Sequence, residues 1–135
     1  MNSKKTIVSH AKKTIIDESL AISKLANFVD ESFAEAVELI YNSKGRVIIT
    51  GIGKSAIIAN KIVATLNSTG TPSVFMHAAD AIHGDLGLIL KDDTVICISK
   101  SGNTPEIKVL MPLIKKAKNS LIAITGNMKS VLAEQ

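Results

Sequence analysis

Cysteine is scarce in this sequence, and long apolar runs are missing from it. The single cysteine, Cys97, excludes an internal disulfide, and its place in the apolar run 94–98 favours core packing over catalysis. A membrane-spanning helix needs roughly 18 to 20 consecutive apolar residues, and the lysine-rich residues 1–13 are not followed by the apolar core of a signal peptide. We therefore expect a soluble, cytoplasmic protein with no membrane partner.

Aromatic residues are also scarce, at 3% of the sequence. Few side chains are therefore available to stack on bases, although a net charge of +4 agrees with phosphate binding. The lysines are dispersed along the chain, which favours a solvated basic face over a nucleic-acid surface. We expect no nucleic-acid partner.

The 135 residues fit one globular domain, since 46% are hydrophobic and 21% are charged. Apolar residues recur every three or four positions from Ile7 to Val29, which predicts a long amphipathic helix. Asp30 is suited to cap a second helix, which ends before Gly45. Residues 1–45 are thus expected to pack on the same domain, and the first helix has two open roles: simple packing or joining subunits.

From residue 46 the apolar pattern changes to a repeated unit of strand, loop and helix. The expected strands are residues 46–50, 73–77, 94–98 and 120–125. The first loop leads into a helix with Ile58, Ile62 and Leu66 on one face. Strands that alternate with helices predict a Rossmann-like parallel α/β sheet over residues 46–135, with helices on both of its faces.

The end of this α/β region carries two irregularities. Thr104 and Pro105 suit the start of a helix, but Pro112 inside it predicts a kink or an early break. Residues 126–135 are expected to begin another helix. Because an α/β sheet usually continues with a further strand, we expect the chain to be a fragment of a longer domain.

Two loops after predicted strands carry residues that suit an anion, because parallel sheets bind ligands beyond the carboxyl ends of their strands. In the first loop Gly53 allows close approach of the backbone, Lys54 adds a positive charge and Ser55 supplies a hydroxyl. The second loop gathers hydroxyls around a glycine. Its expected phosphate-binding residues are Ser99, Ser101, Gly102 and Thr104.

Other chemistries fit these segments less well. A P-loop would need a glycine where Ile48 stands. A dinucleotide-binding oxidoreductase would have an acidic residue at the end of the second strand, which closes instead on His77, so this is the poorer alternative. His77, Asp80 and His83 are only loosely spaced as metal ligands, and we expect neither a metal nor another cofactor.

The ordered set of motifs resembles the sugar isomerase (SIS) domain and, within it, the D-arabinose 5-phosphate isomerases. The resemblance covers nearly the whole chain. It rests on residues 51–55, 67–72, 83–87 and 99–104, and on Glu106.

This resemblance implies the reversible conversion of D-arabinose 5-phosphate to D-ribulose 5-phosphate through an enediol, without a metal. The reaction supplies Kdo, an eight-carbon sugar of bacterial lipopolysaccharide, and the family enzymes form tetramers. By position, Lys54 would stabilise developing negative charge, Glu106 would move protons, and His83 would assist ring opening or proton transfer. Glu106 has a simpler alternative role, because a carboxylate in a first helical turn also complements the helix dipole.

The sequence departs from the family beyond Gln135. Family members continue there with a second catalytic glutamate, a histidine donated across a subunit boundary, and paired CBS modules, none of which has a counterpart here. We therefore expect sugar-phosphate binding with poor turnover and a weakened or altered tetramer. A sensing module that binds the sugar phosphate without catalysis, as some SIS domains do, is the second functional interpretation.

Overall fold

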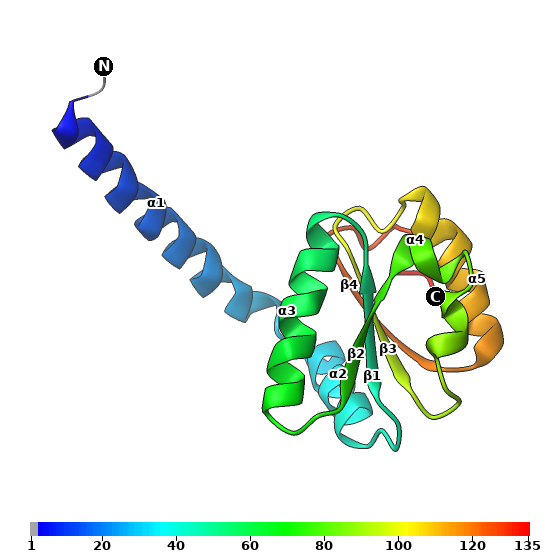
Figure 1. Cartoon of the computed structure of the whole chain (residues 1–135). Helices are drawn as coiled ribbons and strands as arrows, with labels where there is room; N and C mark the ends of the chain where they lie inside the picture. The colour runs from blue at the N-terminus through cyan, green and yellow to red at the C-terminus, as the bar shows by residue number, and fades with distance from the viewer. Residues whose placement is uncertain (1–2) are drawn as a thin grey trace. The chain divides into compact units, whose positions relative to one another are not determined.

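The computed structural model describes residues 3–135, which form two compact units divided between Val37 and Glu38 (Figure 1). The first unit holds α1 (Lys4–Leu25), the 3-10 turn η1 (Ala26–Phe28) and the start of α2 (Glu31–Tyr41). The long helix and the cap of the second helix are thus confirmed. The Ser32 hydroxyl donates to Asp30 Oδ1 at 2.6 Å and lowers the pKa of Asp30, and the Ser32 amide donates to the same oxygen at 3.0 Å.

The apolar residues of α1 are exposed to solvent. None of the residues of this helix is buried. Val8, Ile15 and Ile22 are seven positions apart and are 53%, 67% and 68% exposed. None of the helices over residues 3–135 has the length and apolar character that crossing a bilayer requires.

The second unit is a parallel α/β domain, as predicted. Its four strands have the order β2-β1-β3-β4, and all neighbours are parallel. The predicted second and fourth strands match the structure, the first begins and ends one residue later than predicted, and the third ends one residue later. The elements are β1 (Val47–Gly51), α3 (Lys54–Ser68), β2 (Ser73–His77), α4 (Ala78–Ala81), η2 (Asp85–Leu88), β3 (Thr94–Ser99), α5 (Pro105–Ala117) and β4 (Ser120–Thr125).

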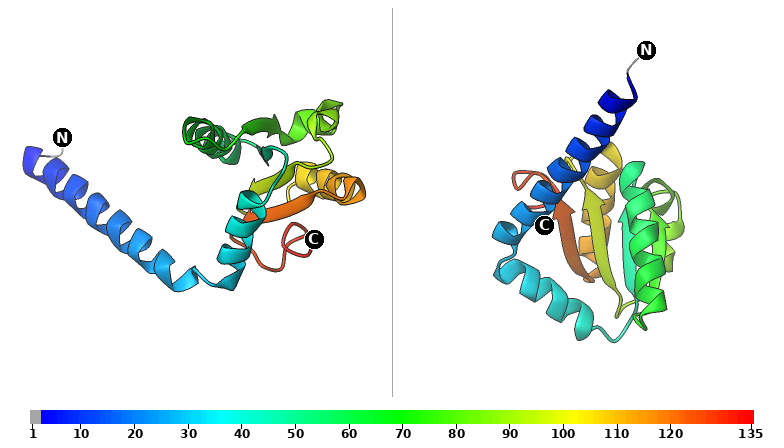
Figure 2. Two further views of the ribbon diagram at one scale, coloured as in Figure 1. Left: turned by 90° about the horizontal axis from the view of Figure 1, so that it is seen from below. Right: turned by 90° about the vertical axis from the view of Figure 1, so that its left-hand side faces the viewer.

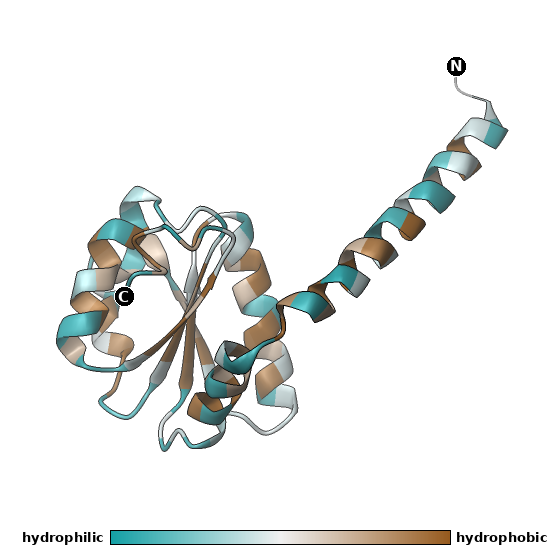
Figure 3. Ribbon diagram, turned by 180° about the vertical axis from the view of Figure 1, so that it is seen from behind, coloured by the Kyte–Doolittle hydropathy of each residue, from teal (hydrophilic) through white to brown (hydrophobic). Residues whose placement is uncertain are grey.

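Different helices cover the two faces of the sheet, and the central strands β1 and β3 are buried throughout, whereas the edge strand β4 is partly exposed. Helix α3 covers one face, and α4 and α5 cover the other (Figure 2). Successive strand residues point to opposite faces, so Ile49 packs with Ala59 of α3, whereas Ile48 packs with Leu110 of α5. The middle of each strand is accordingly hydrophobic in Figure 3.

Cys97 belongs to the core, as its position in the sequence indicates. The residue is 0% exposed and packs on the face that α5 covers. Burial raises the pKa of its thiol to about 12, so the thiol stays protonated at neutral pH.

Helix α3 packs on the sheet with only part of the face that its large apolar residues predict. Ala56 and Ala59 are its buried residues, whereas Ile58 is 55% exposed. Ile62 and Leu66 are partly buried and do pack on this core. Small alanines let the helix approach the sheet closely, and the periodicity of large apolar residues does not reveal this preference.

Near the end of the chain the structure contradicts an early break at Pro112 and the expected helix over residues 126–135. Helix α5 does not break at Pro112 but continues to Ala117, because the proline lies on the exposed side, where solvent can reach the carbonyl that it leaves unpaired. Residues 126–135 form turns rather than a helix. Several of their amides donate to the loop that follows β3.

A partly buried ion pair joins two segments at the amino-terminal edge of the sheet. Arg46 Nη2 lies 2.7 Å from Asp93 Oδ2, and the Asp93 side chain is 1% exposed. The backbone amides of Arg46 and Leu90 also donate to this carboxylate, at 2.8 and 2.9 Å. Burial by itself would raise the pKa of Asp93, but the bonds from Arg46 and from these amides outweigh it and hold the pKa below 3.8.

Candidate functional site

A cleft of about 360 Å³ opens at the carboxyl edge of the sheet, between the loops that follow β1 and β3. These strands are neighbours in the sheet, although β2 lies between them in the sequence, so the cleft lies where the strand order reverses. The residues that line it are Ile52, Ser55, Ser99, Lys100, Ser101 and Thr104. The structure thus brings four of the expected binding residues, all of them hydroxyl side chains, to one place.

The hydroxyls of the second loop are already oriented by the backbone. Gly102 N donates to Ser99 Oγ at 3.1 Å, and Asn103 N donates to Ser101 Oγ at 3.3 Å. A hydroxyl that accepts a hydrogen bond still has its own hydrogen to donate. Both serines can therefore donate to an anion in the cleft.

Thr104 carries a further hydroxyl without a partner. It is the N-cap residue of α5, yet its side chain makes no capping hydrogen bond. Its Oγ1 is buried and has no hydrogen-bond partner among residues 3–135. A buried unpaired hydroxyl costs about 1–3 kcal/mol of stability, which a ligand that accepts its hydrogen would remove.

The two loops need glycine at the positions that the sequence singled out. Gly53 has a φ of 58° and precedes the first residue of α3, and Gly102 has a φ of 65°. Residues with a Cβ rarely adopt this left-handed conformation. At Gly102 a Cβ would also collide with the side chain of Ser130.

Two residues of the cleft were missed by the sequence analysis. Lys100 stands between Ser99 and Ser101 and brings a positive charge to the lining, while Ile52 supplies an apolar surface. The sequence could have indicated Lys100 as a binding residue, because it lies within the hydroxyl-rich loop. Its side chain is exposed, so the charge is available to a ligand in solution.

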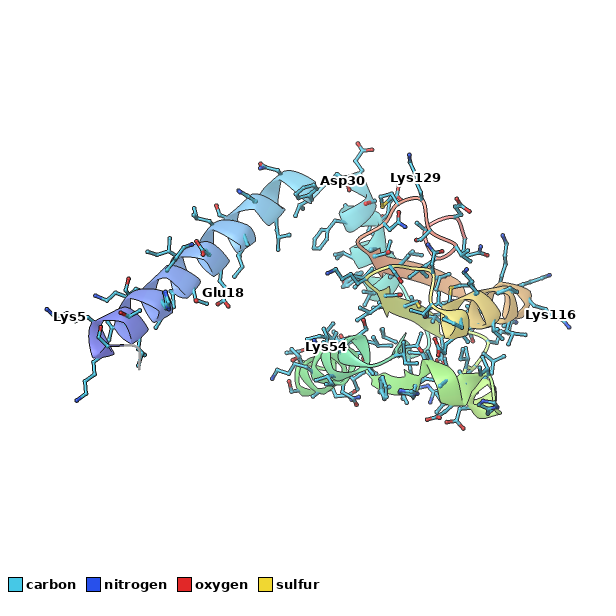
Figure 4. The ribbon with its side chains drawn as sticks, turned by 90° about the horizontal axis from the view of Figure 1, so that it is seen from above. Lys5, Glu18, Asp30, Lys54, Lys116 and Lys129 are labelled. Carbon is cyan, nitrogen blue, oxygen red and sulfur yellow. The ribbon has the colours of Figure 1, made fainter. Side chains whose placement is uncertain are left out.

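The three residues to which the resemblance assigns catalytic roles lie near the carboxyl edge of the sheet but do not line the cleft. Lys54 opens α3 and is exposed (Figure 4), Glu106 is the second residue of α5, and His83 follows α4 and is exposed. Within the described part of the chain, none of these side chains makes a hydrogen bond or an ion pair to another residue. The structure places them separately and does not join them in one network.

The histidine at the end of β2 and the acid of α4 lie near each other without forming a close pair. His77 Nδ1 is 3.8 Å from Asp80 Oδ2, and the ring of His77 stands edge-on to Phe75. Over residues 3–135 no three His, Cys, Asp or Glu side chains are grouped as metal ligands would be.

A parallel α/β sheet with a hydroxyl-lined cleft at its switch point is the architecture of a small-ligand-binding domain of Rossmann-like type. The chain belongs to the SIS domain family, whose model matches residues 39–135. The resemblance drawn from the motifs is thereby confirmed.

Three relatives illustrate the relationship. The chain is 48% identical over 127 residues to arabinose 5-phosphate isomerase KdsD of Pseudomonas aeruginosa PAO1, and 45% identical over 129 residues to arabinose 5-phosphate isomerase KpsF of Escherichia coli CFT073. These two matches include 94% and 95% of this chain but only 39% of the length of each relative. A structure of an E. coli CFT073 protein in complex with arabinose 5-phosphate matches 99% of this chain and 71% of that one, with a TM-score of 0.92 and 41% identity.

Proposed function

We propose that this chain is the sugar-phosphate-binding part of an isomerase that interconverts D-arabinose 5-phosphate and D-ribulose 5-phosphate. In this proposal the enzyme is cytoplasmic and its reaction supplies the synthesis of Kdo. The observation that carries the proposal is the cleft, in which hydroxyls with free hydrogens and Lys100 surround a space of about 360 Å³. Its support outside the structure is the 48% identity to an arabinose 5-phosphate isomerase.

In this proposal the phosphate group occupies the loop after β3. Ser99, Ser101 and Thr104 donate hydrogen bonds to its oxygens, Ser55 donates from the other side, and Lys100 balances its charge. The first turn of α5 follows Thr104 directly, and the free amides of a helix start favour an anion. The sugar then extends from the cleft toward the residues nominated for catalysis.

The chemistry requires one proton to move between neighbouring carbons of the open-chain sugar. A base removes the proton from C2 of the aldose while the C1 carbonyl oxygen takes up a proton, which forms the enediol. The C2 hydroxyl then loses its proton as C1 receives one, and the ketose results. We assign proton movement to Glu106, stabilisation of the developing negative charge to Lys54, and assistance in ring opening to His83.

The test is proton NMR of the chain with D-arabinose 5-phosphate in heavy water. The proton that the base takes from C2 can exchange with solvent before a proton is delivered to C1, so ribulose 5-phosphate that carries deuterium beside the carbonyl is the expected product. Sugar-phosphate binding without exchange would replace the isomerase by a binding or sensing module. Absence of both binding and exchange would refute the proposal.

Glu106→Gln separates catalysis from binding within the same experiment. The variant keeps the size of the side chain but removes its base, so turnover should fall while affinity for the sugar phosphate is retained. Glu38→Gln changes an exposed glutamate of α2 and serves as the matched control. Unchanged turnover in Glu106→Gln would leave the carboxylate with only a helix-dipole role.

We also propose that the protein is a homo-oligomer, of four subunits as in the family, and that α1 contributes to its assembly. The support is the exposed stripe of Val8, Ile15 and Ile22, whose spacing of seven suits helix–helix packing. Ile15→Lys should lower the mass measured by sedimentation, whereas Ala21→Lys, on another side of α1, should not. A monomeric wild-type chain would instead favour packing of residues 1–45 on their own domain.

A further inference from the structure

The turn that follows β4 returns to the loop that contains the hydroxyls. We call residues 126–134 the C-terminal turn and residues 99–104 the phosphate loop. Two main-chain hydrogen bonds join them: Gly126 N donates to Lys100 O at 3.1 Å, and Leu132 N donates to Gly102 O at 3.2 Å. The phosphate loop is thus bonded at two points to a segment that lies 26 to 30 positions later in the sequence.

Side chains extend this contact. Asn103 Oδ1 accepts from Val131 N at 3.0 Å, while the amide of the same Asn103 donates to Ser101 Oγ at 3.3 Å. Asn103 therefore links the C-terminal turn directly to a hydroxyl that lines the cleft. On the other side, Asn127 Nδ2 donates to Ser101 O at 3.5 Å.

The contact is also closely packed. Ser130 is 0% exposed and Leu132 is 1% exposed, although both lie in a segment without helix or strand. Ser130 Oγ donates to Asn127 O at 2.6 Å, which closes the C-terminal turn on itself. Its side chain occupies the space into which a Cβ of residue 102 would point, so the glycine and the serine fit each other.

We propose that the C-terminal turn holds the phosphate loop in its binding shape, and that Asn103 and Ser130 are positioning residues of the site. A loop that is ordered before the ligand arrives loses less conformational entropy when it binds, and its donors do not need to be rearranged. Neither side chain lines the cleft, so both act through the loop and not by touching the sugar phosphate. The inference rests on the proposed function, because it concerns the shape of the same site.

The test compares two asparagines whose side chains bond to the main chain of another segment. Asn103→Ala removes the bond to Val131 next to the cleft. The matched control is Asn67→Ala, because Asn67 bonds both the amide and the carbonyl of Ser73, at 2.7 and 2.9 Å, where β2 begins at the opposite edge of the sheet. Titration calorimetry with D-arabinose 5-phosphate measures affinity, and hydrogen exchange measures protection of the amides of residues 100–104.

We expect Asn103→Ala to weaken sugar-phosphate binding by about tenfold or more and to speed exchange in the phosphate loop. Asn67→Ala should lower the melting temperature and leave both readouts unchanged. Suppose that the wild-type chain binds the sugar phosphate. Equal binding by Asn103→Ala, or unchanged protection of the loop amides in Asn103→Ala, would then overturn the inference but not the proposed function. A wild-type chain that binds neither D-arabinose 5-phosphate nor inorganic phosphate would overturn the proposed function together with it.

Ser130→Ala provides a second variant in case Asn103→Ala does not fold. It removes the bond from Ser130 to Asn127 O but adds no bulk beside Gly102. Faster exchange of the loop amides and weaker binding, in the same direction as for Asn103→Ala, are expected. Unchanged affinity in folded Ser130→Ala would overturn the role of this serine in positioning.

Discussion

Replacing Thr104 by valine should make the protein more stable and a poorer binder. The Thr104 hydroxyl is buried without a partner, and the side chain does not cap α5. Valine has nearly the same shape and removes the unpaired hydroxyl, whose burial costs about 1–3 kcal/mol. We expect Thr104→Val to raise the free energy of unfolding by about 1 kcal/mol and the melting temperature by about 3 °C.

Binding should change in the opposite direction. A hydrogen bond to a charged group contributes about 1.5–3 kcal/mol, and every 1.4 kcal/mol is tenfold in affinity. If Thr104 Oγ1 donates to the phosphate, its loss raises the dissociation constant for D-arabinose 5-phosphate roughly 10- to 150-fold. Thermal unfolding without ligand and titration calorimetry with ligand measure the two effects on one preparation.

Thr50 offers a matched control for this experiment. Its Oγ1 is also buried without a partner in the described chain, but Thr50 lies within β1 and does not line the cleft. Thr50→Val should therefore stabilise the protein and leave the affinity unchanged. Equal affinities for wild type and Thr104→Val would refute the assignment of this hydroxyl to the ligand, and a destabilised Thr104→Val would refute the account of its burial.

Three other predictions concern stability and reactivity. Asp93→Ala removes the carboxylate that accepts from the Arg46 side chain and from two backbone amides, and should cost about 1–3 kcal/mol, seen as a melting temperature lower by roughly 5 °C. Because the folded pKa of Asp93 lies below 3.8, its contribution is present above that pH and disappears as the pH falls further, so acid titration should destabilise wild type more than Asp93→Ala. The Cys97 thiol, with its pKa raised to about 12, should resist iodoacetamide until the protein unfolds, and stability should decline as the pH rises from 9.0 toward that value. In Gly102→Ala the new Cβ must adopt a φ of 65° and collides with the Ser130 side chain. The variant should lose more than about 1 kcal/mol of unfolding free energy, measured with denaturant, and should bind the sugar phosphate more weakly; full stability would contradict the packing.

The class of fold was readable from the sequence because strands and helices have different periods. Runs such as 94–98 are short, apolar and β-branched, and each is followed by a helical pattern, so the parallel sheet follows from local chemistry. The failures were of another kind. Ala59 packs on the sheet whereas Ile58 is exposed, and Pro112 lies on the exposed side of α5, because contacts with neighbouring elements decide which side of a helix is buried.

The sequence alone determined the sheet, the two loops and the hydroxyls that they carry, since each depends on residues adjacent in the chain. Only the tertiary structure decided that Ser55 and Thr104 share one cleft with Lys100, because that meeting depends on the pairing of β1 with β3. It also decided that residues 126–134 form turns that bond to the phosphate loop, in place of the expected helix. Local patterns record the preferences of neighbours in sequence, whereas a loop and a turn some 30 positions apart meet only when the whole sheet is assembled.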